Sequence, residues 1–231
     1  MKKRLLLLML LPFLTYINNT QAQSNQITIT ESLFQQNLPV FPTRLVKTKP
    51  EIKGTVYVNN KFVAAKINNS KEFYQIRYNA FKDEMEVLGE GGLITLLDKT
   101  KDYIIRTYDN NNKMYQTVLL EDGNRGFAIS LWVDADKNSL YIKENIIFTP
   151  KRPLKNSYEK EIPATFTRST DDFFIKKAGS TSLVKISKNK KSFFTAFEGK
   201  EDEVKQFVQA NDLEINDKDG LIKIMRFYFS S

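Results

Sequence analysis

Apolar and polar side chains alternate most regularly in the stretch Glu72–Leu88. Only the short segment Ala80–Asp83 interrupts the alternation. Strict alternation on both sides of a short polar break predicts an antiparallel hairpin with one buried and one solvent-exposed face. The apolar positions that we expect to be buried together are Tyr74, Ile76, Tyr78, Met85 and Val87.

Similar short segments follow one another between residues 54 and 187, separated by turns rich in Asn, Asp and Gly. Short strands at near-regular spacing indicate an antiparallel β-meander, and the pattern leaves open whether the sheet forms an open or a partly closed barrel. Two further hairpins are expected, one joining 55–58 to 62–67 and one joining 164–168 to 173–177. The other predicted strands are 93–97, 103–108, 114–120, 127–133, 140–148 and 183–186.

The segment Phe127–Val133 predicts a buried row at its odd-numbered positions, Phe127, Ile129, Leu131 and Val133. Trp132 then falls on the opposite face. It would either be covered by the C-terminal helices or offer a flat platform for a sugar. Burial is the commoner use of an aromatic ring, so core contact is the favoured interpretation.

The apolar period lengthens to that of a helix at about residue 188. Three short helices are expected, over 190–197, over 201–210, and from an N-cap at Asn216 to the end of the chain. The predicted fold class is therefore α+β, mainly β. An antiparallel β domain (51–187) would be followed by a C-terminal helical element (188–231) packed on it, since short helices are not stable alone.

Residues 1–22 have the layout of a secretory signal peptide: three bases, an apolar run and a small-residue site ending at Ala22. The apolar run is too short to span a bilayer, so no transmembrane span is expected in the mature chain. Residues 23–50 contain three prolines and are predicted to be an irregular lead-in. The protein is expected to be exported, to the periplasm, the outer-membrane surface or the extracellular medium.

The chain contains no His and no Cys. A Ser-His-Asp triad, a Cys-His dyad, a disulfide and a conventional zinc site are therefore excluded, and no cofactor is indicated. The formal net charge is +8, and the excess is concentrated in 150–191, with 11 bases and 4 acids. The basic segment 151–191 is either a solvated surface or a site for an anionic glycan, a lipid headgroup or another envelope protein. Nucleic acid is not expected, because no recognisable binding module accompanies the charge.

The chain contains the short motifs G-T-V-Y at 54–57, R-Y-N at 77–79, D-E-M-E at 83–86 and L-I-K-I-M-R-F-Y at 221–228. With these motifs it resembles uncharacterised exported proteins common in Bacteroidota. The resemblance implies an envelope location and a β-rich body with a helical tail. No activity, ligand or catalytic residue is established for that family.

Two groups of residues are candidate sites. Asp134, Asp136 and Asn138 have the spacing of the first three ligands of a calcium loop, but Ser139 replaces the turn glycine and Asn145 stands where the bidentate Glu belongs. A polar turn between two strands is the competing interpretation, and no metal is expected overall.

The carboxylates of Asp83, Glu84 and Glu86 suggest a glycosidase pair. Arg77 lies across the predicted hairpin, and a solvated face is the favoured interpretation because charge runs usually mark exposed surface. Together these patterns favour a non-catalytic binding or structural component of the cell envelope. A hydrolase that uses carboxylates or a Ser/Lys pair is the alternative.

Overall fold

The computed structural model describes residues 40–41, 52–152 and 162–230. The predicted signal peptide (1–22) lies outside these ranges, as does the lead-in (23–50) apart from Val40–Phe41. Residues 153–161 of the basic segment also lie outside them.

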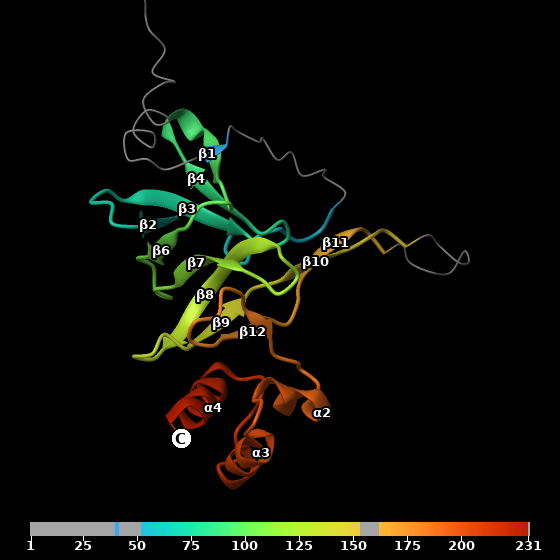
Figure 1. The fold of residues 1–231 in the computed structure, drawn as a ribbon. Helices are drawn as coiled ribbons and strands as arrows, with labels where there is room; N and C mark the ends of the chain where they lie inside the picture. Colours follow the sequence, from blue (N-terminus) through green and yellow to red (C-terminus); the bar gives the residue numbers. More distant parts are fainter. Residues whose placement is uncertain (1–39, 42–51, 153–161, 231) are drawn as a thin grey trace, which may run out of the picture.

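The described strands form one large antiparallel sheet that curls into a half-barrel (Figure 1). Their order is β1-β5-β4-β3-β2-β6-β7-β8-β9-β12-β13. Strands consecutive in sequence are neighbours except that β1 lies beside β5, β6 returns to pair with β2, and β12 follows β9. The edge strands β1 and β13 do not pair with each other, which leaves the barrel open. The strands are β1 Val40–Phe41, β2 Val63–Ile67, β3 Tyr74–Asn79, β4 Glu84–Leu88, β5 Ile94–Leu97, β6 Ile104–Thr107, β7 Met114–Leu119, β8 Arg125–Val133, β9 Ser139–Lys143, β12 Asp172–Lys176 and β13 Val184–Lys185.

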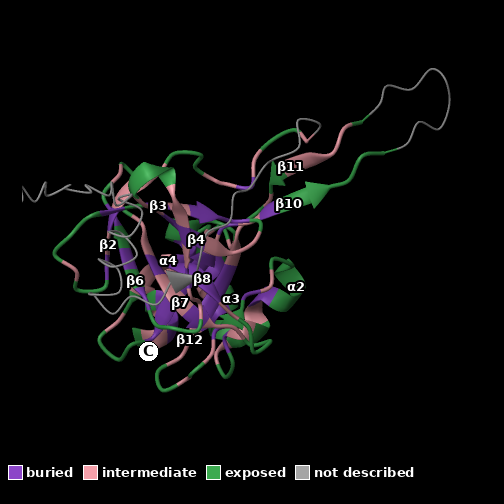
Figure 2. Cartoon of the chain, turned by 90° about the horizontal axis from the view of Figure 1, so that it is seen from above, coloured by how far each residue is buried: buried purple, intermediate pink, exposed green. Residues whose placement is uncertain are grey.

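Two further strands, β10 (Ile146–Thr149) and β11 (Thr165–Arg168), pair only with each other and form a ribbon that stands away from the body (Figures 1 and 2). The single strand predicted over 140–148 is therefore wrong. The strand is interrupted at Glu144 and Asn145, between β9 and β10. The Asn145 carbonyl accepts a hydrogen bond from the Ser169 backbone N–H, and the chain therefore turns toward β11 at this point.

Two predicted hairpins are also wrong. Residues 164–168 and 173–177 do not pair, because β11 joins β10 whereas β12 joins β9 and β13. The segment 55–58 forms no strand with 62–67, since β2 pairs with β3 and β6 and Tyr57 bridges to Asn79 alone.

The central hairpin prediction is confirmed. β3 and β4 pair with Tyr78 opposite Met85 and Ile76 opposite Val87. All five predicted core positions, including Tyr74, are at most 8% exposed, and they belong to one continuous core. A 3-10 turn over Glu90–Gly92 (η1) then leads into β5, as the glycines there predict.

The C-terminal helices cover one end of the half-barrel (Figure 1). They are α2 Lys190–Phe193, continued by the 3-10 turn η2 Phe194–Ala196, then α3 Glu201–Ala210 and α4 Lys218–Ser230. The expected cap at Asn216 is wrong by one residue: the Asp217 carboxylate accepts the hydrogen bond from the Gly220 backbone, at 2.9 Å. None of the described helices is long and apolar enough to cross a membrane.

The buried row predicted in β8 holds only for its first half. Phe127 and Ile129 are buried, whereas Val133 is 48% exposed. The register with β9 shifts between Ser130 and Trp132, and such a bulge reverses which side chains face the core. Trp132 consequently stacks on Phe229 of α4, with ring centroids 6.1 Å apart, which confirms core contact.

Candidate functional site

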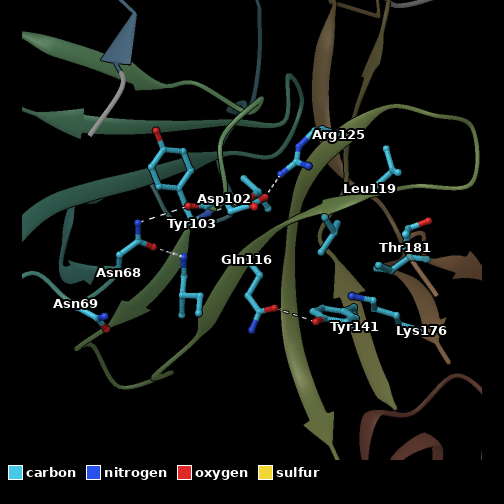
Figure 3. A pocket seen from close by; sticks show the side chains of 14 residues that line it. Asn68, Asn69, Asp102, Tyr103, Gln116, Leu119, Arg125, Tyr141, Lys176 and Thr181 are labelled. Atoms are coloured by element: carbon cyan, nitrogen blue, oxygen red, sulfur yellow. Dashed lines mark hydrogen bonds and ion pairs between the residues drawn. The ribbon is translucent and has the colours of Figure 1, made fainter. Parts of the chain in front are cut away.

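A groove of about 750 Å³ runs over the outer face of the sheet, the face opposite the main core (Figure 3). It crosses β6, β7 and β8 and reaches Tyr141 of β9 and Lys176 of β12. The sheet brings these side chains together because residues on neighbouring antiparallel strands lie side by side. The residues that line the groove are up to 115 positions apart in sequence, from Asn68 to Leu183.

The floor of the groove includes Val118, Tyr141 and Leu183, which belong to a second, small apolar cluster. Its buried members are Val118, Ala128, Tyr141, Phe174 and Leu183. Leu183 enters this cluster because its backbone N–H donates to the Leu119 carbonyl at 2.8 Å. These residues are packed together and almost fully buried. The polar groups of the groove therefore lie over a well-packed apolar layer.

Two of the polar groups are fixed by the protein itself. The Tyr141 hydroxyl donates to Oε1 of Gln116 at 2.9 Å, and burial raises the pKa of Tyr141, which keeps the phenol protonated. On the rim, the Arg125 guanidinium donates to the Lys99 carbonyl at 2.8 Å and pairs with Asp102. The charge of Arg125 is thus already balanced.

Other polar groups of the groove make no contact within the described part of the chain. Oε1 of Gln116 is occupied by Tyr141, but its Nε2 group has no acceptor there. The Lys176 ammonium and the Asn69 amide likewise have no partner among the described residues. Three hydrogen-bond donors, one of them charged, are therefore available to a ligand.

The carboxylates proposed from sequence do not converge on a single site. Asp83 lies at the tip of the β3–β4 hairpin and reaches across to β8 and β9. Its carboxylate accepts hydrogen bonds from the Tyr78 hydroxyl (2.8 Å) and the Phe127 backbone (3.0 Å), and it pairs with Lys143 at 2.6 Å. Burial and the Asp83 charge raise the pKa of Tyr78 well above its usual value.

Glu86 has a different set of partners. It pairs with Arg77 at 2.7 Å and accepts a hydrogen bond from the Tyr57 hydroxyl at 2.9 Å. The Arg77 guanidinium also lies 3.8 Å from the Tyr57 ring centroid and 4.2 Å from that of Phe62.

The expected solvated face is therefore wrong at Glu86, which is only 2% exposed. The segment before β2 folds over this side of the hairpin and covers it. Burial and the bond to Glu86 raise the pKa of Tyr57 to about 12. Glu84 lies opposite Asn79 on β3 and is partly exposed.

Sequence reasoning missed a second buried carboxylate, Glu144, which is 5% exposed. It pairs with Lys113 at 2.7 Å and accepts a hydrogen bond from Tyr115 at 3.2 Å, and Arg168 lies 3.6 Å away. Arg168 also pairs with Asp171, whose pKa is raised by burial and by the nearby Glu144 charge. The sequence offered one weak signal for this burial: Glu144 follows the buried Ile142 by two positions, so in a continuous strand both would lie on the same face. Because each carboxylate has a cationic partner, the cluster is an ion-pair network.

The candidate calcium residues form a tight turn between β8 and β9. Both carboxylate oxygens of Asp134 accept hydrogen bonds from Asn138, one from its backbone and one from its side-chain amide, each at 2.8 Å. Oδ1 of Asn138 accepts a third bond, from the Ala178 backbone at 2.7 Å, and Asp136 is exposed. These ligand atoms hold the turn together, and the described residues contain no group of three or more acids, His or Cys that could hold a metal ion.

The described part of the basic segment 151–191 is divided among several surfaces. Lys185 and Lys188 both pair with Asp172, at 2.9 and 2.7 Å, and Lys177 pairs with Glu198 at 3.3 Å. Lys176 lies in the groove, and Arg152 lies on the ribbon. The described residues of the segment therefore do not form one continuous basic patch.

No protein-family model, no curated protein and no solved structure matches the chain.

Proposed function

We propose that the protein is an exported, non-catalytic binding protein that holds an acidic, hydroxyl-rich ligand, such as an acidic oligosaccharide, in the groove over β6–β9. One observation carries the proposal: the groove presents unpartnered donors from Asn69, Gln116 and Lys176 above an apolar floor. A concave site with a few convergent polar groups on an apolar base is the usual form of a binding site.

The chemistry of the donors favours an anion. The Arg125 charge is balanced by Asp102, which leaves the Lys176 ammonium as the unbalanced charge among the residues that line the groove. An amide N–H and an ammonium both donate hydrogen bonds, so the complementary ligand carries acceptors and a negative charge. A carboxylated sugar offers both.

Two further points support a binding role in preference to catalysis. The single carboxylate that lines the groove is Asp102, which is paired, so the groove lacks the two facing carboxyl groups that glycoside hydrolysis uses. Export is supported by the signal-peptide layout of residues 1–22, and the periplasm or the cell surface is where acidic polysaccharide is encountered.

Calorimetric titration with trigalacturonate, and with neutral maltotriose as the comparison, tests the proposal. We expect trigalacturonate to bind, and Lys176→Gln to weaken its binding by about tenfold or more, since a hydrogen bond to a charged group contributes about 1.5–3 kcal/mol. Lys223→Gln, an exposed site on α4, should bind as the wild type does.

Equal affinity of the wild type and Lys176→Gln would refute the role of the groove. Release of reducing ends during the titration would instead indicate the hydrolase alternative.

A further inference from the structure

The β10–β11 ribbon has one strongly apolar face. In its register Phe148 lies opposite Phe166, and the same register continues to the bridge between Arg152 and Ile162. Side chains two and four positions apart on a strand point the same way, so all four of these residues share a face. Phe148 and Ile162 are 40% and 47% exposed.

Phe81, at the tip of the β3–β4 hairpin, extends this face. Its ring lies 5.0 Å from that of Phe166 and 6.4 Å from that of Phe148, and the latter two rings are 5.1 Å apart. Even with these contacts, Phe81 is 41% exposed. We call Phe81, Phe148, Ile162 and Phe166 the ribbon face.

The base of the ribbon is held firmly. The Lys53 backbone N–H donates to the Ala164 carbonyl at 2.9 Å, and the Phe166 N–H donates to the Lys53 carbonyl at 2.8 Å. The neighbouring Gly54 has φ +79°, and a Cβ there would lie 2.1 Å from the Phe166 carbonyl oxygen. A glycine is needed at this close approach, which fixes the direction in which the ribbon face points.

The charged residues on the described parts of the two ribbon strands are bases. Residues 146–152 and 162–168 include Lys151, Arg152 and Arg168 and no acid. Arg168 is engaged with Asp171 and Glu144, whereas Arg152 is exposed on the same face as Phe148. Lys82 follows Phe81 directly in the hairpin turn and is a second base next to the ribbon face in sequence.

We propose that the ribbon face binds an anionic lipid surface. Exposed aromatic and aliphatic side chains bordered by Lys and Arg are the composition of an interfacial anchor, in which rings enter the headgroup layer and cations meet lipid phosphates. The ribbon stands out from the body (Figure 2), so its side chains can reach a flat surface. An acidic protein partner would need a concave binding surface. The basic residues and the projection of the ribbon from the body therefore favour a lipid surface.

Co-sedimentation with vesicles provides the test. The probes are vesicles of phosphatidylcholine alone and of phosphatidylcholine with phosphatidylglycerol. All variants keep the same N-terminus, so differences between them report on the ribbon face and not on the leader. We expect binding to the anionic vesicles that falls as salt screens the charges.

Two variants separate the contributions. Phe148→Ser/Ile162→Ser removes apolar contact and Lys82→Glu/Arg152→Glu reverses charge. Each should lower the bound fraction at least fivefold, because each basic residue near an anionic surface contributes about 1 kcal/mol and each buried CH2 a similar amount. Val133→Ser, at an equally exposed apolar site at the far end of β8, is the matched control and should bind as the wild type does.

Several outcomes would overturn the proposal: equal binding to neutral and anionic vesicles, no binding, or wild-type binding by both variants. Competition by soluble polyglutamate at the same charge concentration would point to an acidic protein partner instead. If Phe148→Ser/Ile162→Ser fails to fold by circular dichroism, Ile162→Ser alone supplies the apolar test. Lys176→Gln should leave vesicle binding unchanged, so failure of the groove proposal and failure of this one are distinguishable.

Discussion

Replacing Gly126 with alanine should destabilise the protein through a cluster that lies far from it in sequence. Gly126 is buried in β8, and a Cβ there would lie 2.2 Å from Oδ2 of Asp83 and 2.7 Å from Nζ of Lys143. Both atoms are the ends of side chains, so the clash can be relieved by rotation. The cost is therefore the loss of the interactions that hold Asp83 in place.

The size of this loss in stability follows from the interactions of Asp83. Asp83 pairs with Lys143 and accepts hydrogen bonds from Tyr78 and from the Phe127 backbone. Hydrogen bonds to charged groups contribute about 1.5–3 kcal/mol each, and a rotated carboxylate keeps part of this through water, so we expect a loss of about 2–4 kcal/mol. For a chain of this size that lowers the melting temperature by roughly 5–12 °C.

Calorimetric melting of three variants tests the reasoning. Gly123→Ala is the control: Gly123 has φ +80° and open space around it, so backbone strain alone should cost about 1–2 kcal/mol. In the double variant Asp83→Ala/Gly126→Ala, the glycine substitution should add almost nothing to the cost of Asp83→Ala, because the closer clash is gone and the end of the Lys143 side chain, no longer paired with Asp83, can rotate away. A melting temperature of Gly126→Ala within about 2 °C of wild type, or additive effects in the double variant, would refute the argument.

Three further outcomes are expected. In ultraviolet titration, Tyr57 and Tyr103, whose pKa values burial raises to about 12, should stay protonated at about pH 11 in the folded protein; since these folded pKa values exceed the unfolded ones, their contribution to stability is complete below about pH 10 and is lost above it. Normal titration of all ten would contradict this. Phe229→Ala should red-shift the emission of Trp132, the single tryptophan, and cost about 1–3 kcal/mol; unchanged emission would argue against the stack. Burial opposes ionisation of Asp172, but the hydrogen bonds from Lys188 and Lys185 to its carboxylate lower its pKa. The contribution of Asp172 to stability is therefore present above about pH 4 and is lost below it. Asp172→Asn should melt with a smaller dependence on acid than the wild type, and equal dependence would show that this carboxylate is not responsible.

Local alternation was a sufficient guide wherever a strand is straight and one of its faces packs on the core. The five core positions of the β3–β4 hairpin and the bounds of α3 follow directly from the side-chain period. The prediction failed where a neighbouring strand decided the outcome: Val133, beyond the β8 bulge, left the predicted buried row, and Asn145 turned the chain from one sheet to another. Neither event changes the hydrophobic pattern, because each depends on a partner strand.

The amino-acid sequence by itself determined the mainly β architecture and the helical C-terminal element. It also excluded the chemistries that need His or Cys. The tertiary structure alone decided where charge lies. Glu86 and Glu144 read as ordinary polar positions, yet both are buried, because Arg77 and Lys113 on other strands offset the cost of removing a carboxylate from water. The groove is likewise a product of pairing, since Asn69, Gln116 and Lys176 line one groove only when β2, β6, β7, β8, β9 and β12 are in register. Side-chain period is a local property, whereas ion pairing and the convergence of donors depend on distances between residues remote in sequence.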